Sequence, residues 1–216
     1  MAAGLRLKWT GKPGAGPVVA LAHGAGAPMD SPFLNEIADG IHRHGIAVVR
    51  FEFAYMRQRR QDGSRRPPDS APKLLDEWRA VIAKIDGNGV APERLVIGGK
   101  SMGGRIASMV ADETGVAGLA CLGYPFHPPG RAAAPARVAH LADLKTPALF
   151  VQGTRDAFGS RDDVAGYKLA HGIKLFWIED GDHGLRPRKA SGRTEAEALE
   201  EAAAAVAAFA RRVGAA

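Results

Sequence analysis

The chain has 216 residues, and its 29 Lys and Arg residues outnumber 23 Asp and Glu residues to give a formal net charge of +6. This length is typical of a single domain, spanning residues 1–216, that buries a core without help from disulfides or metal ions. We find neither a secretion signal near Met1 nor a run of about 18 apolar residues, so we expect a cytoplasmic protein with no membrane partner. The one cysteine, Cys121, lies in an apolar run and is expected to be buried.

Five of the basic residues are concentrated in one short segment between Tyr55 and Pro67. They are Arg57, Arg59, Arg60, Arg65 and Arg66. A nucleic-acid-binding segment would interleave aromatic or glycine motifs with such charge, or contain a helix-turn-helix, and the sequence has neither. We therefore do not expect nucleic acid as a partner and predict a solvated loop here. A second hypothesis stays open, in which these arginines attract an anionic substrate.

Short apolar runs rich in β-branched residues alternate with amphipathic stretches along the sequence. This alternation is typical of an open, mostly parallel sheet with helices on both faces. In chain order we expect an edge strand at 5–10, a strand at 17–22, a helix at 33–44, a strand at 46–53, a helix at 73–85, a strand at 94–97, a helix at 104–110, strands at 118–124, 147–151 and 173–178, and a closing helix from 194 on. Thr194 and Glu197 have the spacing of a capping box, and Asp162 and Asp163 are expected to begin a short helix.

The fourth predicted strand runs directly into the sequence Gly99-Lys100-Ser101-Met102-Gly103. A G-x-S-x-G pattern between a strand and a helix is typical of a nucleophile elbow, in which a sharp turn exposes the serine above the sheet. The turn forces the serine into an unfavourable backbone conformation and leaves no room for a β-carbon two residues before or after it. With 27 glycines in the chain, the pattern alone also fits a glycine-rich turn. The strand-turn-helix context favours the elbow.

An acid and a histidine follow the carboxyl ends of two later strands. Asp156 comes shortly after the strand at 147–151, and His183 shortly after the strand at 173–178. Functional groups of an open α/β sheet gather beyond the carboxyl ends of its strands. A serine hydroxyl needs an imidazole to take its proton and a carboxylate to orient that imidazole. We therefore predict Ser101 as the nucleophile, His183 as the general base and Asp156 as the acid that orients it.

Other residues compete for two of these roles. His23 also follows a strand, but a residue that opens the first loop is more often structural than catalytic. Asp180 and Asp182 are near His183 in the sequence, yet neighbours on a tight loop seldom face the same ring. Lys100 is expected to point away from the nucleophile and to serve support or packing. We expect no metal ion, because the sequence has no Cys/His cluster and no H-E-x-x-H pattern.

The oxyanion of a tetrahedral intermediate needs backbone amides as hydrogen-bond donors. We assign one donor to Met102, at the start of the elbow helix, and the second to Ala25, with Gly26 as the competing candidate. The predicted substrate-binding residues are Gly24, Gly26, Tyr55 and Tyr124. For Tyr124 the alternative of packing in the core stays open.

These motifs together resemble the α/β-hydrolase superfamily, and within it small bacterial proteins called dienelactone-hydrolase-like. The sequence is similar to a group related to a hydrolase-like subunit of a eukaryotic chromatin acetyltransferase complex and to a testis-expressed homologue. The residues that carry the resemblance lie at 22–26, 51–68, 98–105, 152–156 and 181–183. The resemblance implies a three-layer α/β/α alpha/beta-hydrolase fold with a mostly parallel sheet of six or seven strands, no cap domain and an open cleft. Dienelactone hydrolases carry a cysteine in the elbow, whereas this chain has Ser101 there.

Two functional hypotheses follow from these features. The first is a serine hydrolase that cleaves a small carboxylic ester or thioester through an acyl intermediate on Ser101, without a cofactor. The second is a noncatalytic binding or scaffold protein that keeps the hydrolase fold. An intact triad argues against the second hypothesis, because a scaffold has no physical use for all three groups. The oligomeric state stays open.

Overall fold

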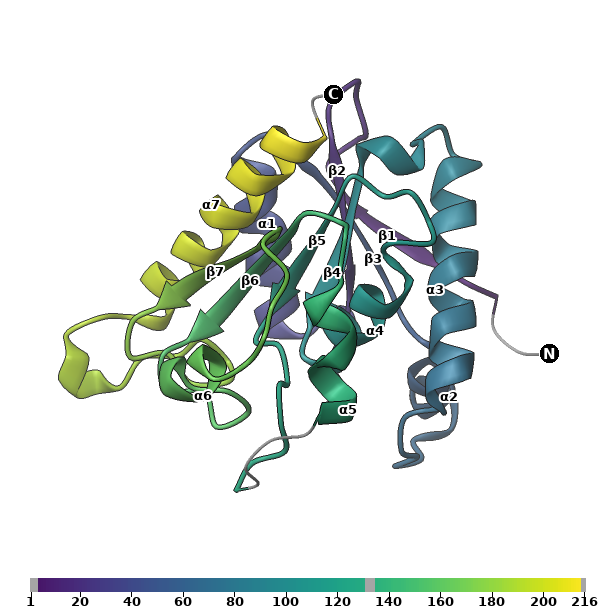
Figure 1. Ribbon diagram of the computed structural model, residues 1–216. Coiled ribbons are helices and arrows are strands. Elements are labelled where there is room, and N and C mark those ends of the chain that lie inside the picture. Colours follow the sequence, from purple (N-terminus) through teal and green to yellow (C-terminus); the bar gives the residue numbers. More distant parts are fainter. Residues whose placement is uncertain (1–3, 131–134, 215–216) are drawn as a thin grey trace.

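The computed structural model describes residues 4–130 and 135–214, which form a three-layer α/β/α structure around one sheet (Figure 1). Seven strands make up this sheet, in agreement with the prediction of six or seven. They are β1 (Leu7–Thr10), β2 (Val18–Ala22), β3 (Ala47–Phe51), β4 (Leu95–Lys100), β5 (Gly118–Leu122), β6 (Ala148–Gly153) and β7 (Ile173–Ile178). Each predicted strand is confirmed, with small shifts at the ends.

The order of the strands across the sheet is β1-β3-β2-β4-β5-β6-β7. β1 pairs antiparallel with β3, and all the other pairs are parallel. Parallel strands have their carboxyl ends at the same edge of a sheet. The loops that follow β2, β4, β6 and β7 therefore emerge at one edge, and these loops contain the predicted functional residues.

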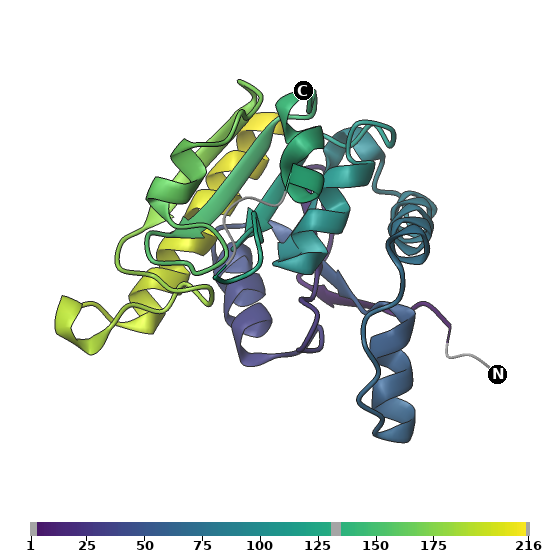
Figure 2. The same cartoon turned by 60° about the horizontal axis from the view of Figure 1, so that its bottom comes forward.

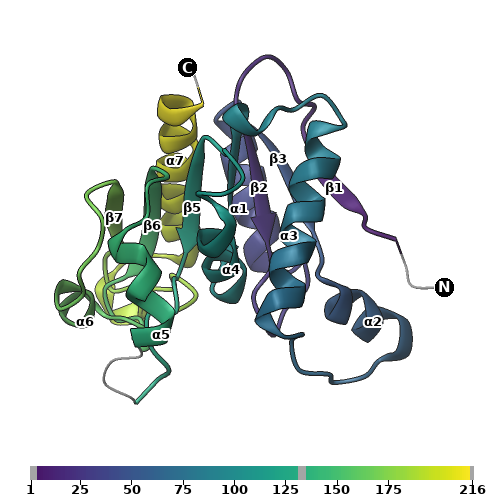
Figure 3. The ribbon, with the colours of Figure 1, turned by 45° about the vertical axis from the view of Figure 1, so that its right-hand side comes forward.

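Helices cover both faces of the sheet, as predicted. α1 (Pro32–Arg43) and α7 (Glu195–Val213) pack together on one face, and α3 (Ala71–Asp86) and α4 (Met102–Val110) pack on the other (Figure 3). Shorter helices are α2 (Ala54–Asp62), α5 (Pro135–Val138) and α6 (Arg161–Ala165), and 3-10 turns lie at Pro92–Arg94, Ala139–Ala142 and Lys189–Ser191. Figure 2 shows α2 extending away from the layered part of the molecule.

Two apolar clusters fill the spaces between the sheet and its helices. Side chains of one strand alternate between the clusters: Val18 and Ala20 of β2 pack on the α3 and α4 side, whereas Val19 and Leu21 pack on the α1 and α7 side. All residues of β2 are fully buried. Burial on both faces explains why the central strands appear in the sequence as continuous apolar runs.

The predicted helix caps are present. The Thr194 hydroxyl accepts from the Glu197 amide at 3.2 Å, and the Glu197 carboxylate accepts from the Thr194 amide at 2.8 Å. Ser160 and Asp163 form a second capping box at the start of α6. These pairs satisfy amide groups that a helix start leaves without a partner.

The prediction of a solvated loop is wrong for residues 54–62, where Arg57, Arg59 and Arg60 lie on a helix. Arg65 and Arg66 follow this helix in an exposed irregular segment, as predicted. α2 begins after Phe53, and Gly63 in the left-handed conformation (φ 68°) ends it. Gln and Arg are good helix formers, and the helix has few apolar residues, so hydrophobic periodicity gave no signal of it. The preceding strand accordingly stops at Phe51, before the predicted end at 53.

Carboxylates within the protein neutralise most of the charge of this segment. The ion pairs are Arg57 with Glu77, Arg60 with Glu52 and Asp30, and Arg66 with Asp62. These carboxylates thus occupy guanidinium groups that were expected to be free under the hypothesis that the arginines attract an anionic substrate.

Between β5 and β6 the described residues contain only α5 and one 3-10 turn, so they form no separate cap domain over the carboxyl edge of the sheet. Cys121 is fully buried in β5 as a free thiol, as predicted. Within residues 4–130 and 135–214, every helix is too short or too polar to cross a membrane.

Candidate active site

Ser101 stands in the sharp turn that joins β4 to α4. Its backbone dihedrals are φ 50° and ψ −115°, which side-chain-bearing residues rarely adopt, and its amide donates to the Leu122 carbonyl at 3.0 Å. Such a conformation costs roughly 1–3 kcal/mol and is typical of functional positions. The strained turn that the sequence pattern predicts is therefore confirmed.

The glycines two residues on either side of Ser101 are required by close backbone contacts. A β-carbon on Gly99 would lie 2.2 Å from the Ala22 carbonyl oxygen, and Gly99 itself has φ 147°. A β-carbon on Gly103 would lie 2.6 Å from the His23 carbonyl oxygen. The elbow therefore packs its backbone directly against the end of β2 and the loop that follows it.

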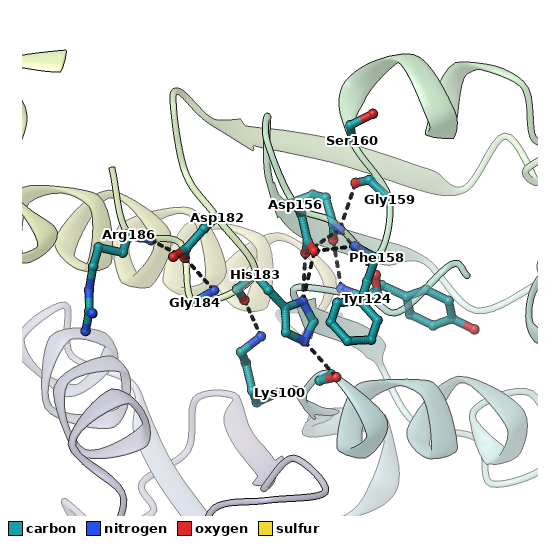
Figure 4. A network of polar contacts seen from close by, with 12 residues as sticks. Lys100, Tyr124, Asp156, Phe158, Gly159, Ser160, Asp182, His183, Gly184 and Arg186 are labelled. Atoms are coloured by element: carbon teal, nitrogen blue, oxygen red, sulfur yellow. Dashed lines mark hydrogen bonds and ion pairs between the residues drawn. The ribbon is translucent and has the colours of Figure 1, made fainter. Parts of the chain in front are cut away.

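Ser101, His183 and Asp156 form a continuous hydrogen-bonded chain. The His183 Nε2 atom lies 3.0 Å from the Ser101 Oγ atom, and His183 Nδ1 lies 2.9 Å from one Asp156 carboxylate oxygen and 3.0 Å from the other (Figure 4). A carboxylate only accepts, so Nδ1 carries a hydrogen, and in the neutral ring with this tautomer Nε2 accepts from the serine hydroxyl. Three residues from separate loops thus meet at the carboxyl edge of the sheet, in the arrangement needed for proton transfer from serine to imidazole.

Asp156 is fully buried and is held by donors that the sequence analysis did not identify. The Gln152 side-chain amide donates to one carboxylate oxygen at 2.8 Å, and the Phe158 backbone amide donates to the other at 2.8 Å. Gln152 is itself fully buried and accepts from the backbone amide of residue 124 at 2.7 Å. A polar residue directly after the predicted strand at 147–151 was the one available signal for Gln152.

The ring of His183 is fixed from two sides. The Phe158 ring lies against it, with ring centroids 4.2 Å apart (Figure 4). The Lys100 ammonium group donates to the His183 backbone carbonyl, which confirms a supporting role for Lys100. Burial lowers the pKa of Lys100 to about 8, while the charges of Asp156 and Asp182 act in the opposite direction. Contacts on the ring and on the backbone together restrict the orientation of the imidazole.

The competing acids have structural partners of their own. Asp180 forms ion pairs with Arg188 and with Arg155, the latter at 2.8 Å. One carboxylate oxygen of Asp182 accepts from the amides of Gly184 at 2.7 Å and Arg186 at 3.0 Å. Both carboxylates stabilise the loop after β7.

His23 is structural, as the sequence analysis expected, and the geometry defines its tautomer. Its Nδ1 atom lies 2.7 Å from the Gly24 carbonyl oxygen, and its Nε2 atom accepts from the Phe53 amide at 3.1 Å. Nδ1 therefore carries the hydrogen, and the ring is neutral. Complete burial lowers the pKa of His23 to about 4.

Acid is expected to destabilise the fold through His23. The unfolded chain protonates this ring near pH 6.5 and the folded chain only near pH 4, so the unfolded state binds more protons between these values. The free energy of unfolding should fall as the pH decreases through this window, by up to about 1.4 kcal/mol per pH unit from this residue. Urea unfolding between pH 7 and pH 4 should show a shallower decrease for His23→Gln than for the wild type. Equal slopes would contradict the assignment.

A cavity of about 620 Å³ opens beside Ser101. Gly24, Ala25 and Gly26 form one wall, α1 contributes Phe33, and the opposite loops contribute the residues at 158, 182–184 and 186. The described lining residues include none of the five arginines between positions 57 and 66. The glycine loop is thus at the cleft, as predicted, and the arginine-rich helix is not.

Neither predicted tyrosine contacts the cavity, so the prediction that they bind substrate is corrected. Tyr124 is fully buried, stacks on Phe150 and donates its hydroxyl to the Arg137 carbonyl at 2.7 Å. The core alternative therefore holds for Tyr124. Tyr55 is also buried, behind the glycine loop, where its hydroxyl reaches the carbonyls of Gly24 and Ala25. An aromatic residue near a strand end gives no sequence signal for which way its ring points.

The two predicted oxyanion donors lie on either side of the nucleophile. Met102 is the first residue of α4, directly after Ser101. Ala25 lies in the glycine loop that lines the cavity, and a β-carbon at the adjacent Gly24 would be 3.8 Å from the Ser101 β-carbon. The loop and the elbow are therefore in close contact, although the donor roles of both amides stay predictions.

A family model described as alpha/beta hydrolase domain matches residues 15–211. The chain therefore belongs to the alpha/beta hydrolase domain family. The elbow, the loops of Asp156 and His183, and the lack of a separate cap domain among the described residues agree with this membership.

Solved structures with the same fold include several hydrolases. Est1E from Butyrivibrio proteoclasticus with bound ferulic acid is 16% identical, with 98% of this chain and 96% of that chain covered and a TM-score of 0.70. A dienelactone hydrolase from Anabaena variabilis is 20% identical, with 97% and 90% covered and a TM-score of 0.65. A lidless α/β serine hydrolase from Xanthomonas campestris is 20% identical, with 94% and 89% covered and a TM-score of 0.62. At these identities the likeness concerns the fold.

Proposed function

We propose that this protein is a serine hydrolase that cleaves a small carboxylic ester or thioester through an acyl intermediate on Ser101. The observation that carries the proposal is the hydrogen-bonded chain from Ser101 Oγ through His183 to the buried Asp156 carboxylate. A serine hydroxyl attacks a carbonyl readily only when a base removes its proton. Here an imidazole stands at hydrogen-bonding distance from the hydroxyl, with its second nitrogen held by a carboxylate.

In the proposed reaction, Ser101 Oγ attacks the carbonyl carbon while His183 Nε2 takes the hydroxyl proton. Asp156 keeps the hydrogen on Nδ1 and stabilises the imidazolium that forms. The tetrahedral intermediate collapses, the bond to the alcohol or thiol breaks, and Nε2 returns the proton to that leaving group. A water molecule then attacks the acyl-serine by the same route, which releases the carboxylic acid and restores the serine.

Two backbone amides are the proposed donors to the oxyanion, those of Met102 and Ala25. Met102 lies at the N-terminus of α4, where the positive end of the helix dipole also favours developing negative charge. Loss of one such donor costs about 3 to 4 kcal/mol of transition-state stabilisation. Each of these two amides is therefore expected to contribute substantially to the rate of the chemical step, although neither belongs to the triad.

The cleft favours a small substrate with an apolar part. Its volume of about 620 Å³ is within the usual range for small-molecule sites, and it lies open beside the sheet. Phe33 and Phe158 supply aromatic surface, and Arg186 and Glu195 form an ion pair with each other at 2.9 Å. Lys100 and Asp182 add one more charge of each sign to the lining. The charges in the lining therefore offset one another, which favours a neutral ester or thioester over a strongly anionic one.

A fluorophosphonate probe tests the proposal directly. The probe should label the wild-type protein at a single site, and Ser101→Ala should abolish labelling because no hydroxyl is left to attack phosphorus. Thermal unfolding of both proteins checks that each is folded. A folded wild-type protein that is neither labelled nor active on p-nitrophenyl esters would refute the proposed function and favour a scaffold role.

A further inference from the structure

The loop that lines the cleft is held by the side chain of His23, which precedes it, and by two side chains of α2, Tyr55 and Arg59. The Gly24 carbonyl accepts from His23 Nδ1 at 2.7 Å and from the Tyr55 hydroxyl at 3.3 Å. The Ala25 carbonyl accepts from the same hydroxyl at 3.1 Å and from Arg59 at 3.4 Å. One hydroxyl hydrogen is thus shared between two successive peptide carbonyls.

The planar peptide bond turns these contacts into a constraint on the amides. In a trans peptide unit, the carbonyl of one residue and the N–H of the next point in opposite directions. A Gly24 carbonyl held toward Tyr55 therefore directs the Ala25 N–H away from Tyr55. By the same geometry, the held Ala25 carbonyl directs the Gly26 N–H away from it.

The side opposite Tyr55 is the cleft. Gly24, Ala25 and Gly26 line the same cavity as Ser101, whereas Tyr55 is only 1% exposed. Among the described residues, the Ala25 and Gly26 amides donate to no other backbone group. Both amides thus point away from Tyr55 and remain available to an oxygen atom bound in the cleft.

Tyr55 is well placed to fix the loop because its own position is rigid. Its ring stacks with Phe53 at a centroid distance of 6.4 Å and packs against His23 at 5.7 Å, and the Arg59 guanidinium lies over it at 5.3 Å. The Ala54 amide donates to the Glu77 carboxylate at 2.8 Å, which anchors the start of α2 to α3. Burial raises the pKa of Tyr55, so its hydroxyl keeps its hydrogen and remains a donor at neutral pH.

We propose that Tyr55 is a positioning residue for the oxyanion hole, which orients the peptide units of the 24–26 loop so that the Ala25 amide faces the oxyanion formed at Ser101. The inference rests on the proposed hydrolase function and adds a residue to it. Tyr55 acts through the loop and does not touch substrate. Its loss should therefore weaken binding of the transition state while leaving binding of the substrate nearly unchanged.

The test compares two variants that each remove one buried hydroxyl bound to a backbone carbonyl. Tyr55→Phe removes the contact with the glycine loop, and Tyr124→Phe removes the contact with the Arg137 carbonyl, away from the cleft. With p-nitrophenyl acetate, Tyr55→Phe should lower kcat about 10- to 100-fold with little change in KM. The inhibition constant of phenylboronic acid, whose serine adduct is tetrahedral and carries an oxyanion, should rise by a similar factor. Tyr124→Phe should match the wild type in both.

The outcomes separate this inference from the proposed function. If the wild type turns over substrate and Tyr55→Phe has the same kcat and the same affinity for phenylboronic acid as Tyr124→Phe, the proposed positioning role of Tyr55 is wrong. A variant with raised KM and unchanged kcat would also overturn it, because Tyr55 would then contact the substrate. A folded wild type that does not react with a fluorophosphonate would refute the hydrolase proposal itself. Thermal unfolding of both variants checks that each is folded at the assay temperature.

Discussion

Asp156→Asn is expected to lower kcat by about 10⁴-fold while KM changes little. The carboxylate is fully buried, and each of its oxygens already accepts from a fixed donor, Gln152 on one side and the Phe158 amide on the other. An asparagine in this place must turn its NH₂ group toward one of these donors. It cannot accept from His183 Nδ1 with both atoms, and it cannot stabilise an imidazolium by charge.

Steady-state kinetics with p-nitrophenyl acetate measure this effect, and Asp182→Asn is the matched comparison. Asp182 also lies on the loop of His183, but one of its oxygens accepts from the Gly184 and Arg186 amides, and the asparagine oxygen preserves both bonds. Asp182→Asn should therefore retain most of the activity. A larger loss of kcat in Asp182→Asn than in Asp156→Asn would contradict our assignment of Asp156 as the acid that orients His183.

The second large effect is expected for Gly98→Ala, which should destabilise the fold by more than about 3 kcal/mol or prevent folding. A β-carbon at Gly98 would lie 1.8 Å from the Ala120 carbonyl oxygen and 2.7 Å from its carbonyl carbon. Both atoms belong to the backbone of β5, the strand paired with β4 at this point. No side-chain rotation relieves the clash, so the two central strands must separate.

Thermal unfolding followed by circular dichroism measures this loss, with Gly16→Ala as the control. A β-carbon at Gly16 meets no atom within 4 Å, so this variant should unfold close to the wild-type temperature. Gly98 precedes the G-x-S-x-G pattern and is outside it, so its substitution separates the packing of the sheet from the geometry of the elbow. A stable and folded Gly98→Ala protein would show that the close contact of β4 with β5 is not required.

The sequence predicted the sheet and the three central side chains because both depend on local patterns. Apolar runs identify buried strands, and the rule that functional groups follow strand ends then selects Ser101, Asp156 and His183 from many candidates. Their convergence needs only the parallel topology, which the alternation of strands and helices indicates. The strained backbone at Ser101 also followed from the pattern alone.

The features that the sequence did not predict depend on which partners each side chain meets in the folded structure. α2 has too few apolar residues for a periodic signal, so its arginines looked like a solvated loop. Tyr55 and Tyr124 each follow a strand, but their rings turn behind the loop and into the core, because packing partners decide their direction. Gln152, four residues before Asp156, and the Phe158 amide, two residues after it, hold the Asp156 carboxylate. The second contact is an Asx turn, a short-range pattern that any aspartate in a loop can form and that does not by itself mark a catalytic acid.

The positive φ of Ser101 bears on why a serine, and not a glycine, occupies this position. Glycine adopts positive φ without steric penalty, whereas serine at φ 50° does so at a cost to the fold. In a lineage selected only for a well-folded scaffold, mutation would replace this serine by glycine and gain thermostability. Under the proposed function, the hydroxyl group at this corner is kept for its reactivity despite that cost.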